Sequence, residues 1–266
     1  MNHYLTGLLV LSLTAGIWLA ARQSASAEKN APASIRFNRT GGLLIDHKNV
    51  NAIDSASPQA VARIKQMSVF FAHASVGTNM VAGLNTLRQE NSARYALSAR
   101  DASQAPPAKT ELGVFYHCAR GNPGWNEKVR QFEGFVRRGW NSGKTSVVIN
   151  KFCYIDETAK LEDYTQSMAG LEKTYPDTVF VYVTMPVTTA LDAKSEKRRA
   201  FNEGLRKWTQ ENGKVLYDLA DIETWSEDGK DCGKLCAEYT YDNGHLNALG
   251  QRRASKALYS LLVQLK

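Results

Sequence analysis

The stretch MSVFFAHASVGTNMVAGLNTLRQE, residues 67–90, decides the fold class. It opens with a short apolar run, Met67–Ala72, which predicts a buried strand. From Gly77 to Glu90 the apolar side chains recur three and four residues apart, which is the spacing of a helix with one buried face. A strand that leads directly into such a helix is the repeating unit of α/β proteins.

Four further apolar runs alternate with helical patterns toward the C-terminus. The runs are Leu112–His117, Thr145–Asn150, Thr178–Met185 and Lys214–Leu219. They are continuously apolar rather than alternating, as strands are when helices cover both faces of a sheet. We therefore predict an α/β fold with a parallel sheet of five strands, in the order 2-1-3-4-5, between two helical layers. Functional sites in such a sheet lie beyond the carboxyl ends of the strands.

The first residues carry a targeting pattern. An apolar run, residues 5–20, precedes the small-x-small triplet Ala25-Ser26-Ala27. We predict a cleaved signal peptide over residues 1–27, and hence a periplasmic or secreted protein with no stable membrane insertion. An uncleaved membrane anchor is the alternative, although the run is short of the ~20 residues that a bilayer needs. We expect the polar residues 28–65 to be a leader over the domain, and residues 66–266 to be the α/β domain.

The charge balance limits the classes of partner. The chain has 33 Lys and Arg against 26 Asp and Glu, for a formal net charge of +7. A basic exported protein can bind anionic polymers or a membrane surface. The basic residues are interspersed with acidic ones, however, so we expect a mixed, solvated surface. Because we expect the protein outside the cytoplasm, we expect no nucleic-acid partner.

The chain has four cysteines, and export would allow them to pair. Cys232 and Cys236 enclose a very short loop and are the expected pair. Cys118 and Cys153 each follow a predicted strand, and the sequence leaves their pairing open. Zinc binding at Cys232 and Cys236 is the alternative, but the histidines of a zinc site are missing from the pattern, so we expect no metal.

Ser75 lies at the turn between the first predicted strand and its helix. This position exposes a hydroxyl and directs a helix N-terminus at negative charge that forms beside it. A serine becomes a strong nucleophile only when a base takes its proton. Without such a base, a serine at the start of a helix is ordinarily an N-cap.

Asp242 and His245 can provide that base. A carboxylate three residues before a histidine, in a loop that enters the last helix, can fold back onto the imidazole. The carboxylate then fixes the imidazole tautomer, and the imidazole accepts the serine proton. The alternative for this pair is a structural histidine that caps the last helix.

Together, Ser75 and Asp242-x-x-His245 resemble the SGNH (GDSL-like) hydrolase superfamily in order, spacing and context. The resemblance covers residues 67–266 and implies a flavodoxin-like, three-layer α/β/α fold. In that fold the serine follows the first strand and the DxxH pair precedes the last helix. Three segments are similar to a divergent branch with the first block FxHxSVG: residues 71–77, 151–154 and 244–247.

The resemblance is incomplete at two blocks. His73-Ala74 stand where the superfamily has Gly-Asp, and the Gly-x-Asn-Asp block is absent after the third predicted strand, where residues 150–153 read NKFC. The oxyanion hole therefore has to be assembled from other donors. The expected donors are the backbone N–H groups of Ser75 and Gly121 and the side chain of Asn122. The alternatives are Asn150 and Lys151.

Four side chains near these blocks are candidates for substrate binding: His73, Lys151, Trp125 and Tyr154. The two aromatic residues fall in loops on the proposed active face, where a ring can stack on a sugar; packing is the alternative. For His73 we favour a structural role beside the serine over contact with substrate. For Lys151 the alternative is a solvated side chain.

The sequence therefore predicts an exported serine esterase that removes acyl groups, O-acetyl groups in particular, from a glycan or another ester substrate without a cofactor. Transfer of acyl groups onto a polysaccharide by the same triad is one alternative. Non-catalytic glycan binding on a degenerate fold is the other, and the missing Gly-x-Asn-Asp block keeps it open. The sequence leaves the acyl group, its carrier and the oligomeric state undetermined.

Overall fold

The computed structural model describes residues 42–265 apart from 103–105, 107 and 143–145. The predicted signal peptide, residues 1–27, and the first part of the predicted leader lie outside the described residues. No helix within the described ranges is long and apolar enough to cross a membrane.

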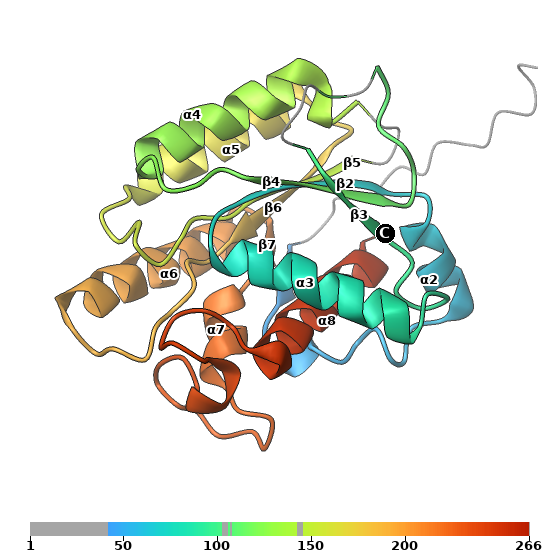
Figure 1. Cartoon of the computed structure of the whole chain (residues 1–266). Helices are drawn as coiled ribbons and strands as arrows, with labels where there is room; N and C mark the ends of the chain where they lie inside the picture. The colour runs from blue at the N-terminus through green and yellow to red at the C-terminus, as the bar shows by residue number, and fades with distance from the viewer. Residues whose placement is uncertain (1–41, 103–105, 107, 143–145, 266) are drawn as a thin grey trace, which may run out of the picture. The chain divides into compact units, whose positions relative to one another are not determined.

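The described residues build a parallel sheet of seven strands (Figure 1). The strands are β1 (Leu43–Ile45), β2 (Ser68–His73), β3 (Ser98–Asp101), β4 (Val114–Ala119), β5 (Ser146–Asn150), β6 (Val179–Val183) and β7 (Val215–Tyr217). Their order is β1-β7-β6-β5-β2-β4-β3, and every neighbouring pair is parallel. The five predicted strands are β2, β4, β5, β6 and β7, and they lie in the predicted order.

The predicted count of five strands is wrong, because the sheet has one more strand at each edge. β1 has three residues and β3 has four, and β3 reads SARD, without the apolar run that signals a buried strand. β1 belongs to the segment expected to be a leader, and it pairs with β7. The same segment forms the helix α2 (Pro58–Ile64). The described part of the leader therefore adds a strand and a helix to the fold.

Helices cover both faces of the sheet, as the predicted α/β/α layers require (Figure 1). One face carries α4 (Trp125–Phe135), α5 (Leu161–Thr174) and α6 (Ala193–Glu211); the other carries α3 (Val76–Glu90), α7 (Leu219–Thr224) and α8 (Ala248–Gln264). The short helices are η2 (His47–Asn49), η3 (Val136–Trp140) and η4 (Ala237–Tyr239). Successive side chains of a strand point to opposite faces, so Phe71 packs under α3 and α8 while Phe70 packs under α4.

α3 and α8 approach closely because Gly83 has no side chain. A Cβ at Gly83 would lie 2.7 Å from the carbonyl carbon of Gln251 and against the hydroxyl of Ser255. α3 begins directly after Ser75, and α8 begins shortly after His245. The close packing of these two helices therefore brings together the two segments that carry the predicted chemistry.

Cys232 and Cys236 form the predicted disulfide, with their Cα atoms 5.5 Å apart. The bond occupies both thiols and so excludes the alternative of zinc binding at this pair. Cys118 and Cys153 are buried free thiols, the first on β4 and the second just after β5.

Candidate active site

Ser75 occupies the turn between β2 and α3 in a strained backbone conformation. Its φ of 50° and ψ of −108° are a combination that residues other than glycine rarely adopt. Ser75 occupies the N-cap position of α3, but its side chain makes no capping hydrogen bond, so capping does not account for the hydroxyl. The helix begins at Val76, so its positive N-terminal end lies beside the serine.

The Ser75 hydroxyl is hydrogen-bonded to His245. The distance from Ser75 Oγ to His245 Nε2 is 2.5 Å, and the distance from His245 Nδ1 to Asp242 Oδ2 is 2.6 Å. When Nδ1 carries the ring proton toward the carboxylate, Nε2 is left to accept the Ser75 proton. The structure thus brings the three predicted residues into contact in the order that a Ser–His–Asp mechanism needs.

Backbone groups hold the Asp242 carboxylate in place. Asp242 Oδ1 accepts hydrogen bonds from the backbone N–H groups of His245, at 2.7 Å, and Gly244, at 3.1 Å. The bond from the His245 N–H is the largest cause that lowers the pKa of Asp242, so the carboxylate stays ionised. The N-cap of α8 is Asn247, which excludes the helix-capping alternative for His245.

The loop that carries His245 is tied to α3 and to itself. Asn79, on the first turns of α3, accepts a hydrogen bond from the Leu246 N–H at 3.1 Å. The Thr240 hydroxyl donates to the His245 carbonyl at 2.7 Å. Sequence reasoning missed Asn79, whose only signal was a polar side chain one helical turn after Ser75.

Two buried cations fix the end of β2 beneath Ser75. Arg120 Nη2 donates to the carbonyl oxygens of Ala72, at 3.2 Å, and Lys151, at 2.8 Å. The Lys151 ammonium donates to the carbonyl of Ala74 at 3.2 Å. Burial lowers the pKa of Lys151 to about 8 and that of Arg120 to about 10. The predicted substrate contact of Lys151 is wrong, because the side chain is fully buried and faces backbone carbonyls.

A buried ion pair orients Asn122. Lys128 is fully buried, and its Nζ lies 2.6 Å from Asp156 Oδ2 and 3.0 Å from Asn122 Oδ1. Because the amide oxygen faces the ammonium, the amide NH₂ of Asn122 points away from it. Asn122 is exposed, so this NH₂ group remains a candidate donor to a substrate. Nothing in the local sequence signals the burial of Lys128.

The two backbone donors predicted for the oxyanion hole lie after neighbouring strands. Ser75 follows β2 and Gly121 follows β4, which pairs with β2. Within the described part of the chain, the N–H groups of Ser75 and Gly121 make no hydrogen bond. Gly121 has a φ of 65° and open space beside its Cα. Asn150, an alternative donor, is buried on β5 at 1% exposure and cannot reach a substrate.

His73 has a structural position, and its predicted contact with substrate is wrong. The side chain is 1% exposed, and its Nε2 lies 3.3 Å from His117 Nδ1. A Cβ on Gly77 would lie 2.7 Å from His73 Nδ1, which explains why glycine follows in the FxHxSVG block. Burial, followed by the nearby charge of Lys151, lowers the pKa of His73 to about 2, so the ring is neutral.

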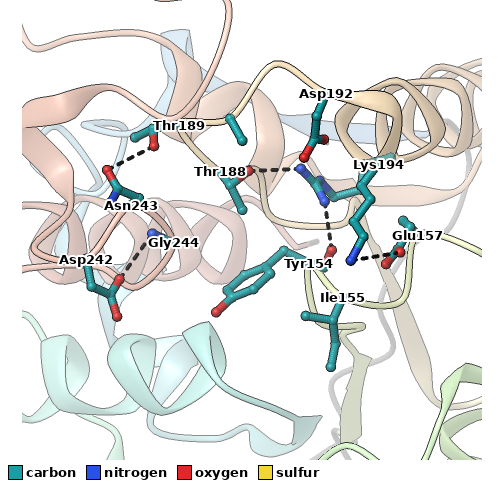
Figure 2. A pocket seen from close by; sticks show the side chains of 12 residues that line it. Tyr154, Ile155, Glu157, Thr188, Thr189, Asp192, Lys194, Asp242, Asn243 and Gly244 are labelled. Carbon is teal, nitrogen blue, oxygen red and sulfur yellow. Dashed lines mark hydrogen bonds and ion pairs between the residues drawn. The ribbon is translucent and has the colours of Figure 1, made fainter.

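An open pocket of about 280 Å³ lies beside Asp242 (Figure 2). Most of the residues that line it have polar side chains, among them Glu157, Thr188, Thr189, Asp192, Lys194, Arg198 and Asn243. Tyr154, a predicted substrate contact, lines this pocket as well. Trp125 begins α4 and packs against the core beneath that helix, so its contact with a substrate stays a prediction.

Among the described residues, one group has the composition of a metal site: Asp46, His47 and Asp221. These side chains already have protein partners. His47 Nδ1 lies 2.5 Å from Asp221 Oδ1, and the ring stacks on Trp225 with centroids 4.1 Å apart. Asp46 caps η2. The contacts therefore account for the group as part of the fold.

No protein-family model and no curated protein matches this sequence. Solved structures match it in fold. A candidate acylhydrolase from Bacteroides fragilis has a TM-score of 0.51 at 12% identity, over 77% of this chain and 93% of its own. A GDSL-like lipase from Bacteroides thetaiotaomicron has a TM-score of 0.47 at 10% identity, over 81% of this chain and 97% of its own. The first likeness is one of fold, and it agrees with the predicted three-layer α/β/α architecture.

Proposed function

We propose that this chain is a serine ester hydrolase of the SGNH type, in which Ser75 is the nucleophile, His245 the general base and Asp242 the residue that orients the base. The pair of hydrogen bonds that joins the three side chains, 2.5 Å and 2.6 Å long, carries the proposal. A serine that does not cap its helix, and whose hydroxyl meets an imidazole held by a carboxylate, is arranged for attack on a carbonyl group.

In the first half of the reaction, Ser75 Oγ forms a bond to the ester carbonyl carbon while its proton passes to His245 Nε2. The π electrons of the carbonyl move to its oxygen, which becomes an oxyanion. When the carbonyl forms again, the bond from this carbon to the alcohol oxygen breaks, and His245 gives its proton to that oxygen. The alcohol leaves, and the acyl group remains on Ser75.

In the second half, water attacks the acyl-serine and passes a proton to His245. The new tetrahedral intermediate releases the carboxylic acid, and Ser75 Oγ takes the proton back from the imidazolium. Asp242 stays ionised and stabilises the imidazolium in both halves. This scheme uses no cofactor.

The oxyanion would be stabilised at the N-terminal end of α3. The N–H groups of Ser75 and Gly121 are free to donate to it, and the amide NH₂ of Asn122, oriented by Lys128, is a third donor. Donors that are already in position when negative charge develops are usually the largest single contribution to this kind of catalysis.

We infer a short acyl group, O-acetyl in particular, on a hydroxyl-rich carrier such as a glycan. Polar side chains around the pocket beside Asp242 suit hydroxyl groups better than the long apolar chain of a lipid. The Cys232–Cys236 disulfide favours an oxidising compartment outside the cytoplasm, in agreement with the predicted signal peptide.

Hydrolysis of p-nitrophenyl acetate by the purified protein tests the proposal. Ser75→Ala and His245→Ala should each lower kcat/KM by on the order of 10⁴-fold or more, and the double variant should be little worse than either. Asp242→Asn should cost less than Ser75→Ala, because the imidazole remains. Full activity in Ser75→Ala would refute the proposed nucleophile. Release of acetate from an O-acetylated polysaccharide, compared with cleavage of p-nitrophenyl palmitate, tests the carrier.

A further inference from the structure

The loop that follows β5 also brings a polar side chain to the triad. β2 pairs with β4, which leads to Gly121, and with β5, which leads to Tyr154. After β5 the sequence lacks the Gly-x-Asn-Asp block, and the first two polar residues there, Asn150 and Lys151, are buried. Tyr154 is the next polar side chain, and it is half-buried at the pocket beside the triad.

The Tyr154 side chain reaches the triad itself. Its ring meets the His245 ring edge-on, with centroids 5.7 Å apart and an interplanar angle of 70°. A Cβ on Gly244 would lie 3.3 Å from the phenol oxygen, so this oxygen lies over the backbone just before His245. The Ser75 hydroxyl is near enough to the phenol to act on its pKa, which it lowers against the larger effect of burial. Figure 2 shows the ring extending from its loop toward Asp242 and Gly244.

The loop that carries this phenol is braced on both sides. Arg198 donates to the Tyr154 carbonyl at 3.1 Å and to the Thr188 hydroxyl at 2.9 Å. The preceding N–H, from Cys153, donates to Asp156 at 2.7 Å. Burial raises the pKa of Tyr154 above its ordinary value, so the phenol keeps its proton at any pH at which the enzyme would work. A protonated phenol on a braced loop is a fixed hydrogen-bond donor.

We propose that the Tyr154 phenol donates a hydrogen bond to the oxyanion, on the side of Ser75 opposite Gly121. This inference rests on the proposed function. In the free protein the Tyr154 ring lies against the His245 ring, whose Nε2 contacts the Ser75 hydroxyl. Once Ser75 Oγ is bonded to the carbonyl carbon, the oxyanion forms on that same carbon and offers the phenol a stronger, charged acceptor. The phenol keeps its proton throughout and forms no covalent bond. It adds a side-chain donor from the segment after β5, where the Gly-x-Asn-Asp block is missing, to the donor that Asn122 provides after β4.

Tyr154→Phe tests the donor, because it removes one oxygen and keeps the ring. We expect kcat for p-nitrophenyl acetate to fall by about 10²-fold, the usual cost of one oxyanion donor, with KM changed only slightly. Tyr241→Phe is the matched control, since the Tyr241 ring also contacts the His245 ring, at 6.1 Å between centroids, but is mostly exposed. That variant should stay within about twofold of wild type.

A boronic acid separates an oxyanion donor from a structural tyrosine. Phenylboronic acid adds to an active serine as a tetrahedral adduct with a negatively charged boronate. Tyr154→Phe should raise its inhibition constant by a factor similar to the loss in kcat/KM. Two results would overturn the inference: unchanged kcat/KM in Tyr154→Phe, or a loss in kcat/KM without weaker binding of the boronic acid. Either result leaves the proposed function standing as long as wild type is active and Ser75→Ala is inactive. If wild type hydrolyses no ester, the proposed function and this inference fail together.

Discussion

Replacing Gly83 by alanine should separate the two halves of the candidate site. The new Cβ would lie 2.7 Å from the carbonyl carbon of Gln251, whereas ordinary contacts begin at 3.4 Å, and the Ser255 hydroxyl would lie closer still. α3 and α8 would have to part by roughly an ångström. Overpacking of this kind costs about 1–3 kcal/mol, which exceeds the roughly 1 kcal/mol that alanine gains over glycine in a helix. We expect a net loss of up to about 2 kcal/mol in the free energy of unfolding.

The same displacement should affect activity more than stability. α3 begins after Ser75 and α8 follows His245, so parting the helices lengthens the 2.5 Å contact between the serine and the imidazole. A misplacement of about 1 Å in a reacting geometry can cost on the order of 10²-fold in rate. We therefore expect Gly83→Ala to lose at least about tenfold in kcat/KM.

Gly170→Ala is the matched control. Gly170 lies inside α5, and a Cβ there would have no atom within 4 Å. Alanine should stabilise the protein by up to about 1 kcal/mol and leave activity unchanged. Urea denaturation and p-nitrophenyl acetate kinetics on both variants measure the contrast. If Gly83→Ala proves as stable and as active as Gly170→Ala, the close packing of α3 on α8 does not position the triad.

Two further predictions concern the buried groups beneath Ser75. The pKa of His73 is lowered to about 2, so as the pH falls from 6.5 to 4.5 the unfolded chain takes up a proton that the folded protein does not. His73 should therefore cost about 2 kcal/mol of stability over that interval. Denaturation of wild type and His73→Phe at both pH values should show a smaller loss of unfolding free energy in the variant, and equal losses would contradict the prediction. Glu223, whose pKa burial raises to about 8, is present in both proteins, so its contribution cancels in the comparison. Lys151→Met should lower kcat/KM about tenfold, because the Ala74 carbonyl before the serine loses a charged donor worth roughly 1.5 kcal/mol. Unchanged kinetics in a folded Lys151→Met protein would show that the ammonium does not position Ser75.

The core of the fold could be predicted because its signal is continuous. Each of β2, β4, β5, β6 and β7 is an apolar run covered on both faces, and the strand order follows from right-handed crossovers. β1 and β3 escape this reasoning, since edge strands of three or four residues need no such run. The disulfide could be predicted because a sequence separation of only four leaves the two cysteines close together.

The candidate site could be predicted only where residues follow strands in a simple way. Ser75 and His245 meet because both lie beyond the carboxyl ends of the sheet. Lys151 occupies a comparable position, yet its ammonium turns inward to carbonyls supplied by β2, a partner that local sequence does not reveal. For the same reason the sequence pattern could not distinguish the buried His73 from a residue that contacts substrate. It also could not reveal the hydrogen bond from Lys128 that orients Asn122.

Labelling with a fluorophosphonate tests the central claim most directly. The reagent reacts with a serine hydroxyl only where a base activates it, so the label reports the nucleophile without any assumption about the ester substrate. The account predicts one adduct on the wild-type protein by intact mass, located at Ser75 by peptide mapping, and none on Ser75→Ala or His245→Ala. A folded wild-type protein that takes no label, or an adduct on any residue other than Ser75, would contradict it.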